Sequence, residues 1–171
     1  MAGRGAFVGL PRLELCDGML CQTSPQDRPH LRVKMAILLA LRDALRALSS
    51  SLDVATEGSV RVGEYEVPMP DAFVWDPHWG RGAVPVEHVR LVVEVSETTI
   101  RDGLGRKRRI YAAGGVPEYW VADLAGQVMH QHWSPMGDAC AEKALVPFGR
   151  LLASATLEGL QMDTAIPVGP S

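Results

Sequence analysis

The stretch that most limits what this chain can fold into is the run from Leu91 to Val95, in which Glu94 interrupts four aliphatic residues. Consecutive aliphatic residues without alternation are typical of a strand covered on both faces, at the centre of a sheet. A lone carboxylate in such a strand costs several kcal/mol to bury unless it is paired or bound to a metal ion. The run therefore predicts a central strand that carries a functional acid, although a strand at the sheet edge would leave Glu94 in solvent.

The segments before this run predict a hairpin and a helix. Asp17-Gly18, between two alternating apolar runs, indicates a β-hairpin over about residues 13–20. From His30 to Leu48 the apolar period changes to three and four, which predicts an amphipathic helix with Asp27 as its cap and Pro29 in its first turn. Its expected buried stripe is Leu31, Met35, Leu38, Leu41, Leu45 and Leu48.

The remaining pattern predicts several strands and one short helix. Strands are expected over 60–67, 71–75, 90–95, 119–122 and 127–133, with one or two more after Glu142, and a helix over 104–113. This order predicts one α/β domain over residues 1–171 with its core at about 13–160. The expected architecture is a mixed β-sheet flanked by α-helices.

Composition excludes several classes of protein. The 171 residues include 17 Lys and Arg against 20 Asp and Glu, a net charge of −3, which argues against a protein that coats nucleic acid through its overall charge. No apolar run is long enough to cross a membrane, and the first ten residues do not resemble a secretory signal. Three cysteines are too few for a disulfide framework, so we expect a cytoplasmic protein without a membrane partner.

Asp71 and Glu94 form a candidate pair of metal ligands. If the strands at 71–75 and 90–95 are antiparallel, a register that sets Asp71 opposite Glu94 folds the chain between Gly82 and Ala83, beside a glycine-rich turn. Opposed side chains in such a pair have Cβ atoms roughly 5 Å apart. Two carboxylates at that spacing can share one Mg²⁺, with Mn²⁺ as a substitute. In the alternative interpretation, Asp71 only caps a turn at the start of its strand.

Lys107 is the candidate cation of the same site. It lies four residues before Tyr111, on one face of the predicted helix, where an ammonium can hold an attacking water or counter charge on a phosphate. The basic residues around it (Arg101, Arg106, Arg108 and Arg109) form a local cluster that the net charge hides, or only a solvated helix face. Together these groups favour metal-assisted hydrolysis of a phosphodiester bond.

Four motifs carry a resemblance to a known family. They are Met69-Pro70-Asp71, Val92-Val93-Glu94-Val95-Ser96, Lys107 with Tyr111, and Gly115-Val116-Pro117-Glu118-Tyr119-Trp120-Val121-Ala122-Asp123. The chain resembles the bacterial Uma-type restriction endonuclease family of the PD-(D/E)xK nuclease superfamily, over roughly residues 13 to 160. The resemblance implies a restriction-endonuclease-like fold and a DNA substrate, and superfamily members commonly act as homodimers.

The resemblance also implies roles for particular residues. Asp71 and Glu94 match the metal ligands, and the backbone carbonyl of Val95 would complete the protein's share of the coordination. Ser96 stands where the superfamily usually has its lysine, and Lys107 matches the lysine that this family supplies from the following helix. Glu14 matches an N-terminal acidic residue that orients a metal-bound water.

Two positions depart from the family pattern. Met69 stands where an arginine commonly precedes the Pro-Asp pair, and Gly103 stands where an aspartate usually begins the helix, with Asp102 one place earlier.

The sequence thus predicts a Mg²⁺-dependent endonuclease that acts on DNA, with Asp71, Glu94, Lys107 and Glu14 as its catalytic residues. The alternative is a nuclease-fold protein that no longer cuts and serves as a nucleic-acid-binding or interaction module. RNA and branched or single-stranded DNA stay open as substrates. His30 is interpreted as structural, as are His130 and His132, because two histidines without a third ligand are a weak zinc signal.

Overall fold

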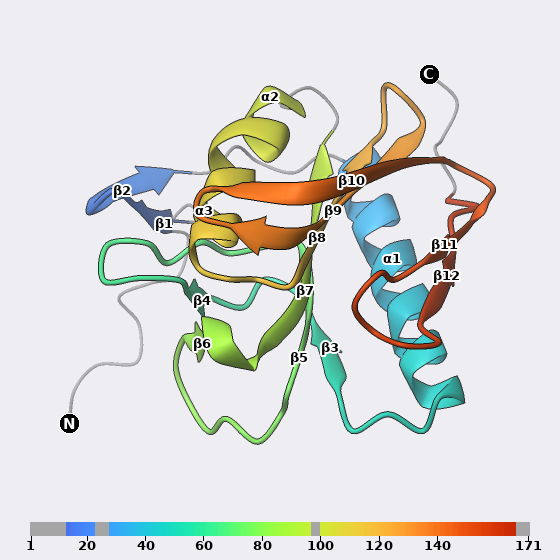
Figure 1. The fold of residues 1–171 in the computed structure, drawn as a ribbon, viewed down its shortest axis with the longest axis horizontal. Coiled ribbons are helices and arrows are strands. Elements are labelled where there is room, and N and C mark those ends of the chain that lie inside the picture. The colour runs from blue at the N-terminus through green and yellow to red at the C-terminus, as the bar shows by residue number, and fades with distance from the viewer. Residues whose placement is uncertain (1–12, 23–27, 97–99, 167–171) are drawn as a thin grey trace.

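The computed structural model describes residues 13–22, 28–96 and 100–166, and its centre is a six-stranded sheet (Figure 1). The strands lie in the order β10-β9-β8-β7-β5-β3, and β7 and β8 are the parallel pair in an otherwise antiparallel sheet. The mixed sheet predicted from the sequence is therefore confirmed. Its strands are β3 (Asp53–Ala55), β5 (Ala72–Trp75), β7 (Val89–Ser96), β8 (Glu118–Asp123), β9 (Val128–Met136) and β10 (Ala139–Pro147).

Helices cover both faces of this sheet. Helix α1 (Arg28–Ala47) packs on one face, where the apolar cluster includes Val33, Leu91 and Trp120. The other face is covered by one continuous helical stretch, which comprises α2 (Ile100–Asp102), the π-helical turn η2 (Gly103–Lys107) and α3 (Arg108–Ala113). A second apolar cluster, which includes Phe73 and Tyr119, lies on that side. None of the described helices is long and apolar enough to span a membrane.

Strand β7 occupies the centre of the sheet, as predicted, with β5 and β8 as its neighbours. Ala72 pairs with Val93 and Phe73 with Val92, and one further step in this register sets Asp71 opposite Glu94. The predicted antiparallel register is therefore confirmed. The connection is not a simple turn, because it contains β6 (Val84–Pro85), which pairs in parallel with β4 (Val60–Arg61), and the 3-10 helix η1 (Val86–His88).

The predicted buried stripe of the first helix is partly wrong. Leu41 and Leu45 are buried, but the stripe continues through Ile37 and Val33, whereas Leu31 and Met35 are exposed, as is Leu48 just after the helix. Apolar residues cover more than one face of this helix, so two stripes satisfy the same period and packing against the sheet selects one. The helix begins at Arg28 with Pro29 in its first turn, and the predicted cap Asp27 lies outside the described residues.

Two other boundaries differ from the prediction. Strand β4 contains only Val60–Arg61, because the backbone turns back at Val62, whose N–H donates to the carbonyl of Glu66 at 3.0 Å. The helix expected over 104–113 already includes Ile100, so its first turns carry Arg101 and Asp102.

The predicted N-terminal hairpin is confirmed as β1 (Leu13–Cys16) and β2 (Met19–Gln22). Asp17 and Gly18 both have positive φ angles, 50° and 73°, as a two-residue hairpin turn requires. Leu15 exchanges backbone hydrogen bonds with Val67, which fixes the hairpin against the segment that leads into β5.

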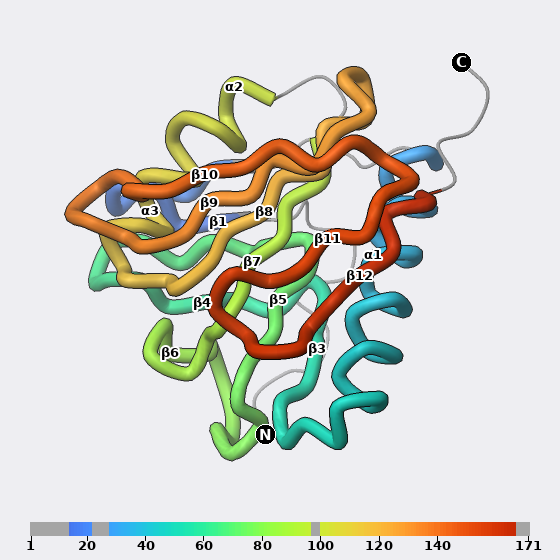
Figure 2. Tube along the Cα trace, turned by 45° about the vertical axis from the view of Figure 1, so that its right-hand side comes forward, coloured from blue at the N-terminus to red at the C-terminus, as the bar shows by residue number. Residues whose placement is uncertain are grey.

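A second hairpin, β11 (Leu151–Ala153) and β12 (Gln161–Asp163), lies beside α1 (Figure 2). Glu118 of β8, which is fully buried, fixes the start of its loop. Its carboxylate accepts hydrogen bonds from the backbone N–H groups of Ala155 and Thr156. It also accepts from the side chains of Trp120, Gln131, Ser154 and Thr156, and all these bonds are 2.6 to 3.1 Å long. Burial would raise the pKa of Glu118, but these donors lower it below its ordinary value.

Glu118→Gln should lower the free energy of unfolding by about 2 to 4 kcal/mol at neutral pH, because an amide group replaces one acceptor oxygen among these donors. The pKa of Glu118 is lower in the folded state, so its stabilisation is present above its ordinary pKa and is lost as the pH falls through the folded value. Urea unfolding of both proteins from pH 7 to pH 3 checks this. The difference should shrink on acidification, and a difference independent of pH would contradict it.

Candidate active site

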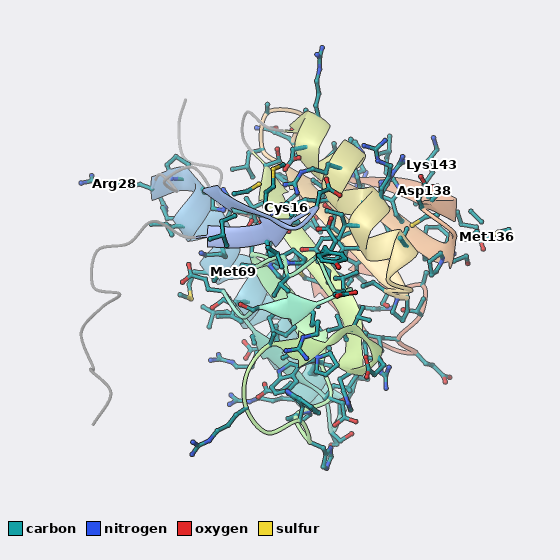
Figure 3. The ribbon with its side chains drawn as sticks, turned by 90° about the vertical axis from the view of Figure 1, so that its left-hand side faces the viewer. Cys16, Arg28, Met69, Met136, Asp138 and Lys143 are labelled. Carbon is teal, nitrogen blue, oxygen red and sulfur yellow. The ribbon has the colours of Figure 1, made fainter. Side chains whose placement is uncertain are left out.

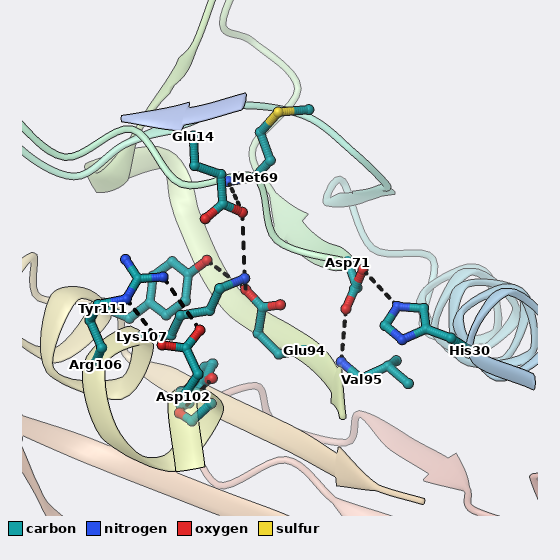
Figure 4. A network of polar contacts seen from close by, with 12 residues as sticks. Glu14, His30, Met69, Asp71, Glu94, Val95, Asp102, Arg106, Lys107 and Tyr111 are labelled. Atoms are coloured by element: carbon teal, nitrogen blue, oxygen red, sulfur yellow. Dashed lines mark hydrogen bonds and ion pairs between the residues drawn. The ribbon is translucent and has the colours of Figure 1, made fainter. Parts of the chain in front are cut away.

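Three buried carboxylates gather where β1, the segment before β5, strand β7 and the helical stretch 100–113 meet (Figure 4). Glu14, Asp71 and Glu94 are only 2%, 4% and 5% exposed. One ammonium group, that of Lys107, lies among them. The cluster therefore carries more negative than positive charge, which is costly to bury without a further cation.

Glu94 lies at the centre of this cluster. Its Oε1 atom accepts hydrogen bonds from Lys107 Nζ and Tyr111 Oη, each at 2.9 Å. Burial raises the pKa of Glu94 to about 7, although Lys107 favours the ionised form, and the neighbouring carboxylates of Asp71 and Glu14 act in the same direction as burial. Burial and Glu94 also raise the pKa of Tyr111 well above its ordinary value, so its hydroxyl stays a donor.

Glu14 reaches the cluster because its hairpin is fixed to the chain around Val67. Its Oε1 atom accepts from the backbone N–H of Met69 at 3.3 Å and lies 3.5 Å from Lys107 Nζ. Burial would lower the pKa of Lys107, but Glu94, Glu14 and Asp71 raise it above the ordinary lysine value. Lys107 is therefore charged at every physiological pH.

Asp71 lies beside Glu94 but has its own partners. The backbone N–H of Val95 donates to its Oδ2 atom at 2.9 Å, and its Oδ1 atom lies 3.1 Å from Nε2 of His30, at the start of α1. Burial would raise the pKa of Asp71, but the contacts with His30, Val95 and Lys107 lower it, so its carboxylate is ionised. The N–H and C=O of one strand residue point to the same side. The Val95 carbonyl therefore also points toward the side of Asp71.

The structure brings all the predicted site residues into one region, although their catalytic and metal-binding roles stay predictions. Glu14, Glu94 and Lys107 are in direct contact, and Asp71 with Val95 forms the adjoining part. Sequence reasoning missed that Tyr111 binds Glu94 and that His30 contacts Asp71. The spacing of Lys107 and Tyr111 was a signal for the first contact. His30 belongs to the N-terminal segment that resembles the family, but no spacing in the sequence indicated its contact with Asp71.

A divalent cation fits the chemistry of these donors. Within the three described ranges, no three His, Cys, Asp or Glu side chains converge closely enough to chelate a metal by themselves. Mg²⁺ does not need such a cage, since it is commonly held by one or two carboxylates and keeps several waters. Ser96, two residues beyond Glu94 on the same face of β7, is buried, and its hydroxyl has no partner in the described part of the chain. A buried hydroxyl of this kind fits a metal-bound water as its partner.

The basic residues near Lys107 do not form the single cluster expected from the sequence. Arg106 pairs with Asp102 at 3.0 Å. Arg106 and Arg109 both face a groove of about 420 Å³ that Asp17 and Glu66 also line, while Arg108 lies toward β9 and β10. Consecutive residues of a helix point in different directions, so a run of basic residues is divided among several surfaces.

Lys107→Met should destabilise the protein by about 3 to 5 kcal/mol at neutral pH, because Glu14 and Glu94 lose the ammonium that compensates their burial. The loss of the ammonium raises the folded-state pKa of Glu94 further. The variant should therefore recover stability relative to the wild type as the pH falls from about 9 to 7, and the difference should stay level below that, where both proteins carry protonated Glu94. Thermal unfolding across this range tests the prediction, with Arg46→Met, at an exposed position of α1, as the control. An equal loss at every pH would contradict it.

Comparisons with known proteins identify the fold and the family of this chain. The chain is similar in structure to a protein from Anabaena variabilis ATCC 29413, described as "a putative nuclease belonging to DUF820". The TM-score is 0.68 at 12% sequence identity, over 92% of this chain and 90% of that one. No curated protein is significantly similar to this sequence. The model of the Uma2 family, described as "Putative restriction endonuclease", matches residues 7–166. The chain therefore belongs to the Uma2 family, of the PD-(D/E)xK nuclease type.

Proposed function

We propose that this protein is a metal-dependent endonuclease that hydrolyses phosphodiester bonds in DNA. The observation that carries the proposal is the buried cluster of Glu14, Asp71 and Glu94 around Lys107. These residues come from the N-terminal hairpin, the segment before β5, strand β7 and the helical stretch 100–113. The family description supports a nuclease, and the excess of carboxylates supports a site that takes up a divalent cation.

Asp71, Glu94 and the carbonyl of Val95 would hold the cation, which is Mg²⁺ or, as a substitute, Mn²⁺. When bound, it supplies Lewis-acid stabilisation of charge on the phosphate and lowers the pKa of bound water. Asp71 is suited to this role because its pKa is lowered, which keeps its carboxylate ionised without the cation. Its contact with His30 fixes the orientation of the carboxylate.

Lys107 supplies positive charge to the reacting phosphate. Because its pKa is raised above the ordinary value, it cannot act as a general base at neutral pH. Its ammonium can instead donate hydrogen bonds to a phosphate oxygen or to an attacking water, as an electrostatic stabiliser. Glu14 and Glu94 hold the ammonium in place from two sides, and Tyr111 keeps Glu94 oriented.

Divalent-cation binding is the first test. Calorimetric titration of the wild type with Mn²⁺ should show a site that is lost in Asp71→Ala. Glu158→Gln, which removes an exposed carboxylate from the loop between β11 and β12, should bind as the wild type does. If the wild type binds no Mn²⁺, or if Asp71→Ala binds it equally well, the proposed metal site is wrong.

Cleavage is the second test. With Mn²⁺ or Mg²⁺ the wild type should cut DNA, and Glu94→Gln or Lys107→Met should lower the rate by at least about a hundredfold. Parallel assays on duplex DNA, single-stranded DNA, branched DNA and RNA identify the substrate. Metal binding without cleavage of any of them would instead support a nuclease-fold module that binds but no longer cuts.

Sedimentation of the wild type tests the homodimer that the family resemblance implies.

A further inference from the structure

A second group of basic side chains lies on the face of the sheet that α3 covers, over β9 and β10. His132 of β9 stands in a row between Tyr119 of β8 and Lys143 of β10, its direct cross-strand partners. Its ring stacks on that of Tyr119 with centroids 6.3 Å apart. His132 is only 5% exposed, yet its Nε2 atom has no hydrogen-bond partner among the described residues.

Arg108 approaches the same place from the helix. It is the first residue of α3, which packs against both β9 and β10. Its Nε atom is buried and likewise has no partner in the part of the chain described. The neighbouring His130 lies 3.7 Å from Asp123, whereas the side chain of Lys143 is exposed and extends the group toward solvent.

The charges that act on His132 are all positive. Burial lowers the pKa of His132 to about 4, and Arg108, His130 and Lys143 act in the same direction. Two cations, Arg108 and Lys143, lie beside two buried nitrogens, Arg108 Nε and His132 Nε2, that have no partner among the described residues, and this combination has the chemistry of an anion site.

We propose that Arg108 and Lys143 bind a backbone phosphate of the substrate against the ring of His132. This inference rests on the proposed function, since the phosphate belongs to the nucleic acid that the active site cuts. Arg108 and Lys143 would contact its oxygens directly, as arginine and lysine do in most protein–DNA interfaces.

The position of this group identifies the phosphate as one that is not cut. Strands in a sheet lie about 4.8 Å apart, so β9 and β10 lie roughly 10 and 14 Å from β7, which carries Glu94. Figure 3 shows Lys143 across the helical stretch from Cys16, which belongs to the hairpin that carries Glu14. Lys107 and Arg108 are adjacent in sequence, but Lys107 faces the carboxylate cluster whereas Arg108 lies toward β9 and β10. The group would therefore anchor the nucleic acid at a distance from the reaction.

The test is DNA binding without metal. A fluorescent duplex is titrated with the full chain in EDTA, at salt concentrations from about 50 to 200 mM, and anisotropy gives the affinity. The double variant Arg108→Ala/Lys143→Ala should bind about tenfold more weakly. The slope of log affinity against log salt should become shallower by about one, as loss of one phosphate contact requires. His132→Phe, which keeps a ring against Tyr119, should weaken binding a few-fold.

Arg46→Ala is the matched control, because it removes an exposed arginine from the last turn of α1, on the opposite face of the sheet. It should leave affinity and slope unchanged. Lys143→Ala alone changes only an exposed side chain, and it should retain wild-type melting and show a smaller loss in the same direction. Wild-type affinity and slope in the double variant would overturn the proposal. Because no cleavage is measured, a changed slope supports the phosphate site even if the protein cuts nothing.

Discussion

The ion pair between Glu94 and Lys107 is the interaction on which the rest of the site depends. A carboxylate at the centre of the sheet is tolerated only with strong partners, and here the ammonium and the hydroxyl of Tyr111 both bond to it. These partners fix the helical stretch 100–113 against β7. Because Lys107 also reaches Glu14, the same ammonium connects the N-terminal hairpin to the sheet. Residues far apart in the sequence are therefore held together by the need to compensate one buried charge.

The sequence alone was sufficient to predict the structure of those segments in which the local residue pattern allows only one way of packing. The apolar run around Glu94 can be buried only as a central strand, and the register of β5 on β7 followed from the position of two acids and a glycine-rich turn. The stripe of α1 could not be predicted in full, since the helix is apolar on more than one face and its neighbours decide which face is buried. The contact of His30 with Asp71 could not be predicted either, because it also depends on how the helix packs against the rest of the chain. It joins the first turn of a helix to a residue 41 positions later, which no local period encodes.

The departure from the family pattern at Gly103 has a structural counterpart. Gly103 is buried, and a Cβ atom there would lie 3.3 Å from a methyl group of Val121, so any side chain would require the Val121 side chain to move by a few tenths of an ångström. The aspartate stands one place earlier, at Asp102, and the turn from Gly103 to Lys107 is a π-helix, a form that accommodates one more residue per hydrogen-bonded ring than an α-helix. Asp102 pairs with Arg106 rather than with Lys107. Lys107 pairs instead with Glu94 of β7 and Glu14 of the N-terminal hairpin.

The net charge of −3 does not describe the local charge at either proposed contact with a nucleic acid, the cluster around Lys107 or the group of Arg108 and Lys143. Several of the acids that produce it are buried in the cluster around Lys107, where a divalent cation would offset them, and another, Glu118, is bonded to the loop of the second hairpin. The cations are divided by the helical stretch, with Lys107 on the side of the carboxylates and Arg108 toward β9 and β10. A polyanion responds to the local field rather than to the total, because salt screens charges more than about 10 Å away. An acidic chain can therefore hold a phosphate backbone, provided that its exposed cations lie together and its carboxylates lie apart from them or bind metal.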